Sequence, residues 1–322
     1  MNKYFIIFLL FIFWTCSKKP ESKVDKTKKT DYIVNKISLV ILGTAQDAGS
    51  PQIACKKECC VNLFDNPNNN RQVVSLGLID TENNKTYLFE ATPDIGKQMK
   101  MITKYESKSN KESVDGIFLT HAHIGHYSGL MYLGKEAMDA KEIPLYVMPR
   151  MKNFLSTNGP WDQLVSRKNI QLQVMENEQV VNLSQSITVT PILVPHRDEY
   201  SETVGYRING PNKNALFIPD IDKWDKWDKN IIDEIKKVDY AFLDAAFYSG
   251  KEINNRDISE IPHPFVIESF ETFKNISEIE KSKIVFIHFN HTNPLLNSKS
   301  VETQIVIDKG YKTGTIGDVF DL

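Results

Sequence analysis

Short apolar runs rich in β-branched and aromatic residues recur along the chain, and turn residues separate them. This alternation is typical of strands bounded by loops. The first run breaks into a loop rich in Gly, Ala and Pro, and the run at 187–196 predicts a pair of strands. Strands are predicted within residues 38–52, 73–80, 85–91, 114–120, 143–149, 187–196, 203–208, 215–220, 238–247 and 284–291.

Other segments carry apolar residues at intervals of three and four, which is the spacing of one face of a helix. Residues 92–106 show this spacing at Ile95, Met99 and Ile102, after a Thr-Pro-Asp start signal. Helices are predicted at 92–106, 126–140, 224–237 and 269–283.

Both halves of the chain combine strands with flanking helices, and no linker separates them. The length of 322 residues suits one large or two small domains. We therefore expect one α/β domain over residues 36–322, a four-layer αββα sandwich of two mixed sheets with helices outside. The net charge of −2 gives no sign of a nucleic-acid-binding surface.

The N-terminus has a different pattern. Residues 4–14 form an unbroken apolar run, too short to span a membrane as a helix but as long as a signal-peptide core. Cys16 resembles the acceptor of a bacterial lipoprotein, although the two residues before it are bulkier than usual. We interpret residues 1–16 as a signal peptide with a lipidated Cys16, and the polar, Lys-rich residues 17–35 as a tether. An exported, membrane-anchored lipoprotein is predicted, with cleaved secretion or an uncleaved anchor as alternatives.

The remaining cysteines are Cys55, Cys59 and Cys60, an odd number that cannot form a complete disulfide framework. Export would place them in an oxidising compartment. Clustered thiols that escape random pairing there indicate a metal site. The alternative is one disulfide and one free thiol.

Four of the seven histidines end or closely follow predicted strands: His121, His123, His196 and His288. His121 and His123 are two positions apart, so in an extended segment they point the same way. His126 opens the next predicted helix and can turn back toward them. Three imidazoles and a water make an open zinc site, so this pattern predicts a metal centre.

The stretch THAHIGH at 120–126, after an apolar strand, resembles the H-x-H-x-D-H metal motif of the metallo-β-lactamase fold superfamily. A lone histidine, an aspartate and a late histidine follow after strands, in the order of that family. Within the superfamily, the segments LGTAQDAGSPQIAC, ATPDIGKQ, IPDIDKWDKW and IHFNHTNPLL are most similar to pyrroloquinoline quinone biosynthesis protein B and its relatives. The resemblance covers roughly residues 38–322.

The resemblance implies two metal positions at one site. The implied ligands of the first are His121, His123 and His196, and those of the second are His126, Asp220 and His288, with Asp220 bridging both. Asp220 would also orient the attacking water and accept its proton. The alternative for Asp220 is a helix N-cap, a role that Asp222 could exchange with it.

Gly125 stands where the family carries the remaining carboxylate of the second position. The first position keeps enough ligands for zinc, whereas the second loses an oxygen and a charge. We therefore expect one or two zinc ions here. The reduced second set, His126, His288 and Asp220, also suits Fe(II).

The same resemblance implies a structural zinc site at Cys55, Cys59 and Cys60, as in cyclic phosphodiesterases of the phosphonate pathway. His291, three residues after His288, would complete a Cys3His set. The spacing C-x3-C-C departs from the expected C-x-C-x2-C.

Candidates for binding an anionic substrate are Arg197, Tyr200 and Arg207, which lie near His196 in the sequence, with a solvated loop as the alternative. His263 is a candidate pocket-lining residue. Asp244 ends a strand. It is expected either to support a ligand histidine or to serve as a cap.

Three functions remain open at this point. The first is a tethered metallo-hydrolase, in which a metal-activated water attacks an ester, lactone or phosphodiester. The second is an oxidative or carrier role in quinone cofactor metabolism, and the third is a non-catalytic, zinc-stabilised lipoprotein. Export argues against a biosynthetic step on a cytosolic peptide, which favours the hydrolase. A small-molecule substrate and a membrane contact through the lipid anchor are the partners expected.

Overall fold

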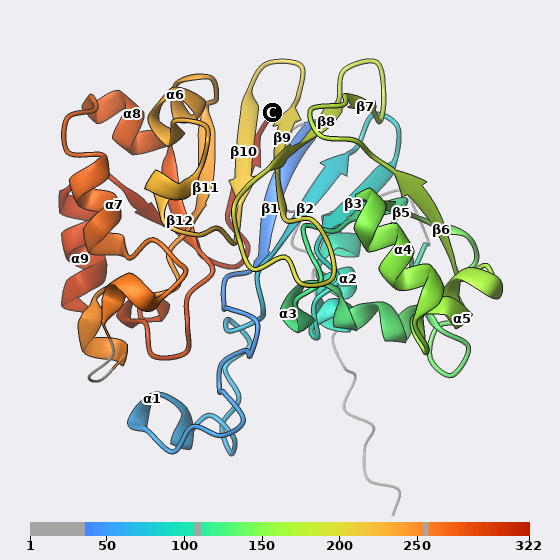
Figure 1. The fold of residues 1–322 in the computed structure, drawn as a ribbon, viewed down its shortest axis with the longest axis horizontal. Helices are drawn as coiled ribbons and strands as arrows, with labels where there is room; N and C mark the ends of the chain where they lie inside the picture. The colour runs from blue at the N-terminus through green and yellow to red at the C-terminus, as the bar shows by residue number, and fades with distance from the viewer. Residues whose placement is uncertain (1–35, 106–110, 254–256) are drawn as a thin grey trace, which may run out of the picture. The chain divides into compact units, whose positions relative to one another are not determined.

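The computed structural model describes residues 36–105, 111–253 and 257–322 (Figure 1). The predicted signal peptide, the lipidated Cys16 and the tether lie outside these residues. In the described part of the chain, no helix is both long and apolar enough to cross a membrane. Both sheets belong to one compact unit, Tyr32–Leu322.

Seven strands form the first sheet. In spatial order they are β14 (Val319–Asp321), β1 (Ile37–Gly43), β2 (Ser75–Asp80), β3 (Lys85–Phe89), β4 (Gly116–Phe118), β5 (Ile143–Val147) and β6 (Ile170–Val174). The strands from β14 to β3 are antiparallel to their neighbours, and those from β3 to β6 run parallel. The last strand of the chain thus closes against the first, with Leu39 opposite Phe320.

The second sheet repeats this arrangement. In spatial order its strands are β13 (Lys312–Thr313), β12 (Ile284–Ile287), β11 (Tyr240–Asp244), β10 (Asn214–Ile218), β9 (Val204–Asn209), β8 (Thr188–Leu193) and β7 (Val181–Asn182). Strands β7 to β10 are antiparallel, and β10 to β13 are parallel. Each sheet is therefore mixed, as predicted.

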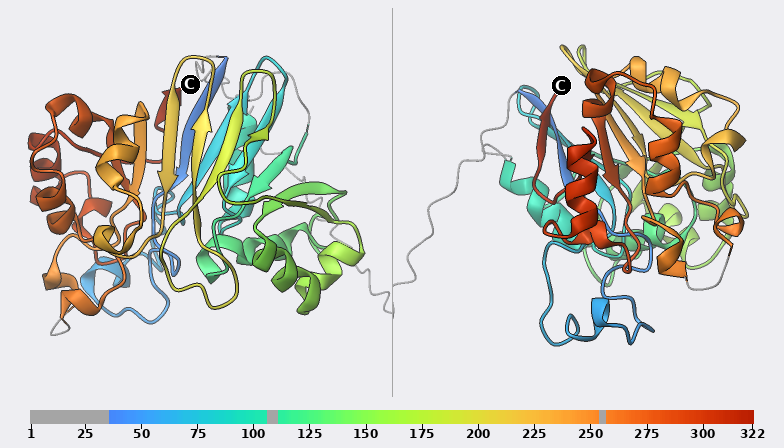
Figure 2. Two further views of the ribbon diagram at one scale, coloured as in Figure 1. Left: turned by 45° about the horizontal axis from the view of Figure 1, so that its top comes forward. Right: turned by 90° about the vertical axis from the view of Figure 1, so that its left-hand side faces the viewer.

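Helices cover the outer faces of the sheets (Figures 1 and 2). On the side of the first sheet they are α2 (Ile95–Ile102), η1 (Thr103–Tyr105), α3 (Ile124–Tyr127), η2 (Ser128–Leu133), α4 (Pro149–Thr157) and α5 (Trp161–Ser166). The later helices are η3 (Trp224–Lys226), α6 (Ile231–Lys236), η4 (Gly250–Ile253), η5 (Ile258–Glu260), α7 (Val266–Thr272), α8 (Glu278–Lys283), η6 (Pro294–Leu296) and α9 (Val301–Asp308). The short α1 (Glu58–Val61) lies in the long excursion between β1 and β2.

Large aromatic side chains fill the space between the sheets. Phe89 and Phe118 of the first sheet meet Tyr206 of the second at ring-centroid distances of 5.4 and 5.6 Å, and all three are fully buried. Burying a side chain of this size stabilises the fold by about 1.5–3 kcal/mol. With apolar clusters also between each sheet and its helices, the layers are helix, sheet, sheet, helix, so the four-layer αββα sandwich is confirmed.

Two predicted elements differ in the structure. The run at 187–196 is the single strand β8, which pairs with β9 along its whole length. The helix predicted at 126–140 is one turn of α3 followed by η2. At Gly129 an added Cβ would lie 2.0 Å from the carbonyl oxygen of Thr92, so the chain packs backbone to backbone and departs from regular helix there.

Two other predicted helices are each split by a cap. Ser277 accepts a hydrogen bond from Glu280 N and starts α8 after α7 has ended. Asn230 caps α6 in the same way, so residues 224–237 form η3 and α6. Trp224 and Trp227 are buried against the second sheet and do not lie on a surface helix.

Candidate metal centre

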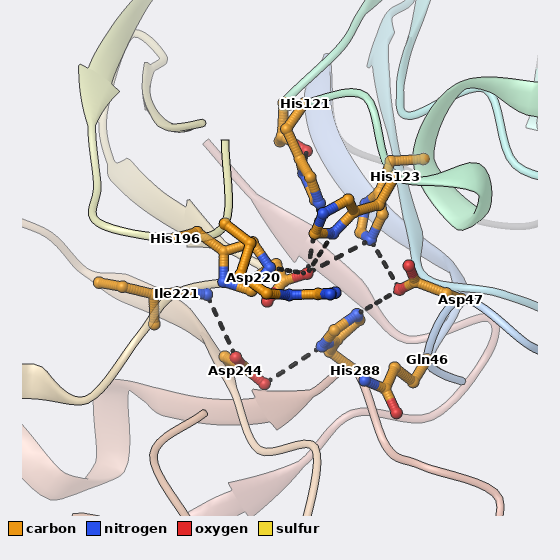
Figure 3. Close-up of polar contacts among 12 residues, drawn as sticks. Gln46, Asp47, His121, His123, His196, Asp220, Ile221, Asp244 and His288 are labelled. Atoms are coloured by element: carbon orange, nitrogen blue, oxygen red, sulfur yellow. Dashed lines mark hydrogen bonds and ion pairs between the residues drawn. The ribbon is translucent and has the colours of Figure 1, made fainter. Parts of the chain in front are cut away.

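Histidine and carboxylate side chains from both sheets converge at one edge of the sandwich, where strands end (Figure 3). A rigid scaffold holds residues at such positions, which favours a functional site. We call these residues the central cluster. They are Asp47 after β1, His121, His123 and His126 after β4, His196 after β8, Asp220 after β10 and His288 after β12.

His121, His123, His196 and Asp220 form the first potential ion site. Their ligand atoms all lie within 4.8 Å of one another. Asp220 Oδ2 is 3.4 Å from His121 Nε2, 3.2 Å from His196 Nε2 and 4.0 Å from His123 Nδ1. A tetrahedral zinc with ligands at about 2.0–2.1 Å separates those ligands by about 3.3 Å. The spacing therefore suits a zinc ion.

Two buried nitrogens support this assignment. The Nε2 atoms of His121 and His196 make no hydrogen bond within the described residues. Leaving such a group unsatisfied costs about 1–3 kcal/mol, so a ligand is expected there. Burial, together with the charge of nearby His126, holds the pKa of His121 well below its usual value. His121 is therefore neutral, the form in which imidazole binds a metal.

His121 and His123 have a hydrogen-bond partner at the other ring nitrogen, and His196 has a carboxylate nearby without a hydrogen bond between them. Such contacts fix the orientation of a ligand imidazole. The pairs are His121 Nδ1 with Thr120 Oγ1 at 2.9 Å, His196 Nδ1 with Asp222 Oδ1 at 3.4 Å, and His123 Nε2 with Glu199 Oε2 at 3.3 Å. Asp222, which the sequence suggested as a cap or an exchange partner of Asp220, thus lies behind His196.

Asp47, His126, His288 and Asp220 form a second group within 4.8 Å. Asp47 Oδ1 lies 3.0 Å from His126 Nε2 and 3.2 Å from His288 Nε2. Asp47 was not predicted as a ligand. The available signal was the Gly/Ala/Pro loop after the first strand, which contains it.

Buried carboxylates also support the histidines of the second group. Glu90 Oε1 lies 3.1 Å from His126 Nδ1, and Asp244 Oδ1 lies 3.1 Å from His288 Nδ1. Glu90 was not predicted, whereas Asp244 was predicted either to support a ligand histidine or to serve as a cap. Glu90 and His288 have φ angles of 81° and 64°, a left-handed conformation that costs non-glycine residues about 1–3 kcal/mol. Such strain concentrates at functional sites.

The charges of this group reinforce one another. Burial alone would raise the pKa of Asp47, but the charge of His126 and contacts with His288 hold it well below its usual value. Burial alone would lower the pKa of His126, but Asp47 and Glu90 raise it well above the usual value. Two carboxylates around one imidazole make a strongly negative environment, which a divalent cation would neutralise.

His263, expected to line a pocket, is buried beside the central cluster. Its Nδ1 lies 3.2 Å from Asp220 Oδ1 and 2.9 Å from Asp244 Oδ2. The oxygens of Asp244 also accept hydrogen bonds from the backbone nitrogens of Ile221 and Ala246. We therefore interpret His263 and Asp244 as a pair that positions Asp220 and His288, rather than as ligands.

Cys55, Cys59, Cys60 and His291, which we call the cysteine cluster, form a separate group. The sulfur of Cys59 is 3.8 Å from those of Cys55 and Cys60, and within the described residues none of the three forms a disulfide. Zinc–sulfur bonds of about 2.3 Å separate tetrahedral sulfurs by about 3.8 Å, so the spacing suits zinc. Nδ1 of His291 is buried and has no hydrogen bond from the described part of the chain. Burial and the charge of Lys57 lower the pKa of its ring.

The substrate-binding candidates have different surroundings. Arg197 and Tyr200 are exposed in the loop after β8, which also carries Glu199, the partner of His123. Arg207 instead forms a 2.6 Å ion pair with Glu234 of α6, on the helix side of the second sheet. The structure therefore does not bring Arg207 to the central cluster, because side chains alternate along β9.

Fold and site together define a class of protein. The profile of the "Beta-lactamase superfamily domain" matches residues 85–289, more than half of the chain. The chain belongs to this superfamily.

The chain is similar to individual proteins of known name and structure. "Coenzyme PQQ synthesis protein B" of Methylorubrum extorquens is 23% identical over 310 residues, covering 88% of this chain and 99% of the relative. The crystal structure of Zn²⁺-bound PqqB from Methylobacterium extorquens covers 88% of this chain and 100% of its own, with 21% identity and a TM-score of 0.72. A diphosphatase of the PhnP family covers 88% of this chain and 96% of its own, with 19% identity and a TM-score of 0.63. The resemblance to the PqqB group is confirmed.

Proposed function

We propose that this protein is a zinc-dependent hydrolase that cleaves a small ester, lactone or phosphodiester. The observation that carries this proposal is the first ion site, with three imidazoles and Asp220 within 4.8 Å of one another and two unsatisfied Nε2 atoms. The diphosphatase of the PhnP family, which has a similar fold, supports the reaction class. In the cell, we propose that the lipid on Cys16 tethers the enzyme outside the cytoplasm.

The residues of the site have separate tasks in this proposal. Zinc held there would lower the pKa of water toward about 7 and polarise the substrate oxygen. Burial alone would raise the pKa of Asp220, but His196 and His263 hold it well below its usual value. Asp220 therefore stays ionised: its Oδ2 lies among the ligand histidines and can orient the water, while His263 holds its other oxygen. Its low pKa makes it a poor proton acceptor.

The loop after β8 provides the substrate-facing groups. The guanidinium of Arg197 is well exposed and lies 4.0 Å from the carboxylate of Glu199. Tyr200 is 64% exposed and packs against the ring of Phe154. We propose that Arg197 binds an anionic part of the substrate and that Tyr200 contacts its apolar part.

The test is hydrolysis by the purified full chain of a phosphodiester, an ester and a lactone reporter, with zinc counted by mass spectrometry. We expect turnover of at least one reporter class. The variant His121→Ala should lose this turnover together with one zinc. Zinc at the central cluster without turnover of any reporter would contradict the hydrolase and favour a non-catalytic protein.

A role in quinone cofactor metabolism is the second candidate, and the match to Coenzyme PQQ synthesis protein B over 88% of the chain favours it. In this alternative the site performs oxidative chemistry or carries the quinone. Iron in place of zinc at the central cluster, or tight binding of pyrroloquinoline quinone followed by fluorescence, would favour this role over hydrolysis.

A further inference from the structure

Gly125 lies against the loop that carries Asp47. A Cβ added at Gly125 would lie 2.3 Å from Asp47 Cα and 2.7 Å from Asp47 Cβ. Real Cβ atoms do not approach backbone this closely, so any side chain at position 125 would displace the loop. The space into which a residue between His123 and His126 would project is therefore filled by another segment of the chain.

We propose that Asp47 is the carboxylate ligand of a second metal ion, held also by His126, His288 and Asp220. The ligand that the H-x-H-x-D-H pattern places at position 125 is here provided from the loop after β1, and Gly125 makes room for it. This inference deepens the proposed function, because it completes the two-ion form of the same site.

The loop is held so that Asp47 points into the site. Gln46 N donates to Phe289 O at 2.8 Å, and Phe289 N donates to Thr44 O at 2.7 Å. Asn290 Nδ2 donates to Gln46 Oε1 at 2.7 Å. These bonds attach the loop to the segment that follows His288, so Asp47 and His288 are positioned together (Figure 3).

The ligand set has a consequence for the ion that it binds. Asp47 adds a carboxylate to the one that Asp220 shares between the two positions, and the two imidazoles would bind the ion in their neutral form. Two imidazoles with carboxylate oxygens suit zinc, manganese and Fe(II). The second position is therefore as complete as the first, despite the glycine in the motif.

The experiment counts ions in the purified full chain after dialysis against excess zinc, and again against manganese. We expect three ions per chain in the zinc sample: one at the cysteine cluster and two at the central cluster. Asp47→Asn should weaken binding of one ion by about 100-fold or more, leaving two per chain at limiting metal. Gly125→Ala, which removes no ligand, should lose the same ion because its methyl group displaces Asp47.

Matched controls separate this effect from general damage. Gly96→Ala adds a methyl group in a place with no atom within 4 Å, and the exposed Asp65→Asn changes a carboxylate in the same excursion. Both should keep three ions.

The result that overturns the proposal is an unchanged count in Asp47→Asn, or a wild-type chain that binds no second central ion in excess metal. If Gly125→Ala does not fold, Asp47→Asn alone decides. Because ion counting needs no substrate, a chain with three ions and no hydrolysis would refute the proposed function and leave this inference intact.

Discussion

The central cluster and the cysteine cluster differ in how the chain builds them. Three ligands of the cysteine cluster lie within six positions of one excursion, and only His291 comes from elsewhere. The central cluster gathers its ligands from the ends of strands in both sheets. The turn after β12 joins the two, since His288 serves one and His291 the other. The three thiols of the cysteine cluster can come together when their loop forms. The central cluster forms only when both sheets have packed together.

The largest effect should follow from Asp220→Asn, because Asp220 belongs to both central ion positions. We expect the ion count to fall from three to one and hydrolysis to fall by about 1,000-fold or more, since metal ions contribute several kcal/mol of transition-state stabilisation. The cysteine cluster should keep its zinc. Metal analysis and reporter hydrolysis check this, with the exposed Asp225→Asn as control. Loss of all three ions would mean that the two clusters are not independent.

The converse change is Cys59→Ser. We expect one zinc to be lost, with both central ions retained, and the free energy of unfolding to fall by roughly 3–5 kcal/mol because a structural metal stabilises the fold directly. In a domain of this size, the melting temperature should fall by roughly 5–8 °C. Calorimetry and metal analysis measure both, and Lys56→Ala is the control in the same segment. Retention of all the zinc would show that the thiols do not bind it.

A smaller effect is expected from Glu90→Gln, which keeps the shape but removes the charge beside His126. Affinity for the second central ion should fall by about 10–100-fold, because partners of ligand histidines contribute about that much. The first ion should be affected less. Competition with a chelator measures both affinities, and the exposed Glu112→Gln is the control. Equal weakening of both ions would show that Glu90 supports the site as a whole.

The smallest effect concerns Glu252, outside the central cluster. Burial raises its pKa from the ordinary 4.5 to about 7, even though Tyr248 N and Ser249 N donate to it. The fold therefore favours the protonated form, and stability falls as pH rises from 4.5 through 7. Glu252→Gln should remove this dependence. Chemical unfolding at several pH values in this range measures the free energy of unfolding. The exposed Glu58→Gln is the control and should lose stability with rising pH as the wild type does. The same loss in Glu252→Gln would contradict the prediction.

Much of the fold was predictable from local pattern. The apolar runs identified most of the strands, because strands buried on both faces are short continuous apolar segments bounded by turn residues. The helices were less reliable: Gly129, Ser277 and Asn230 interrupt segments whose apolar spacing alone predicts a single helix. Capping and backbone contact decided those boundaries, and both depend on neighbours in space.

Some residues of the candidate site were predictable from the sequence, and others only from the structure. The sequence by itself indicated the clustered histidines and cysteines as candidate ligands, and the resemblance to the metallo-β-lactamase superfamily added Asp220, His288 and His291. It also showed that Gly125 lacks a carboxylate. Only the tertiary structure brought Asp47 within 3.0 Å of His126, from which it is separated by 79 positions, and paired Arg207 with α6. Residue types and their spacing can be seen in a short stretch of sequence. The packing of the two sheets decides which distant loop lies beside the histidines.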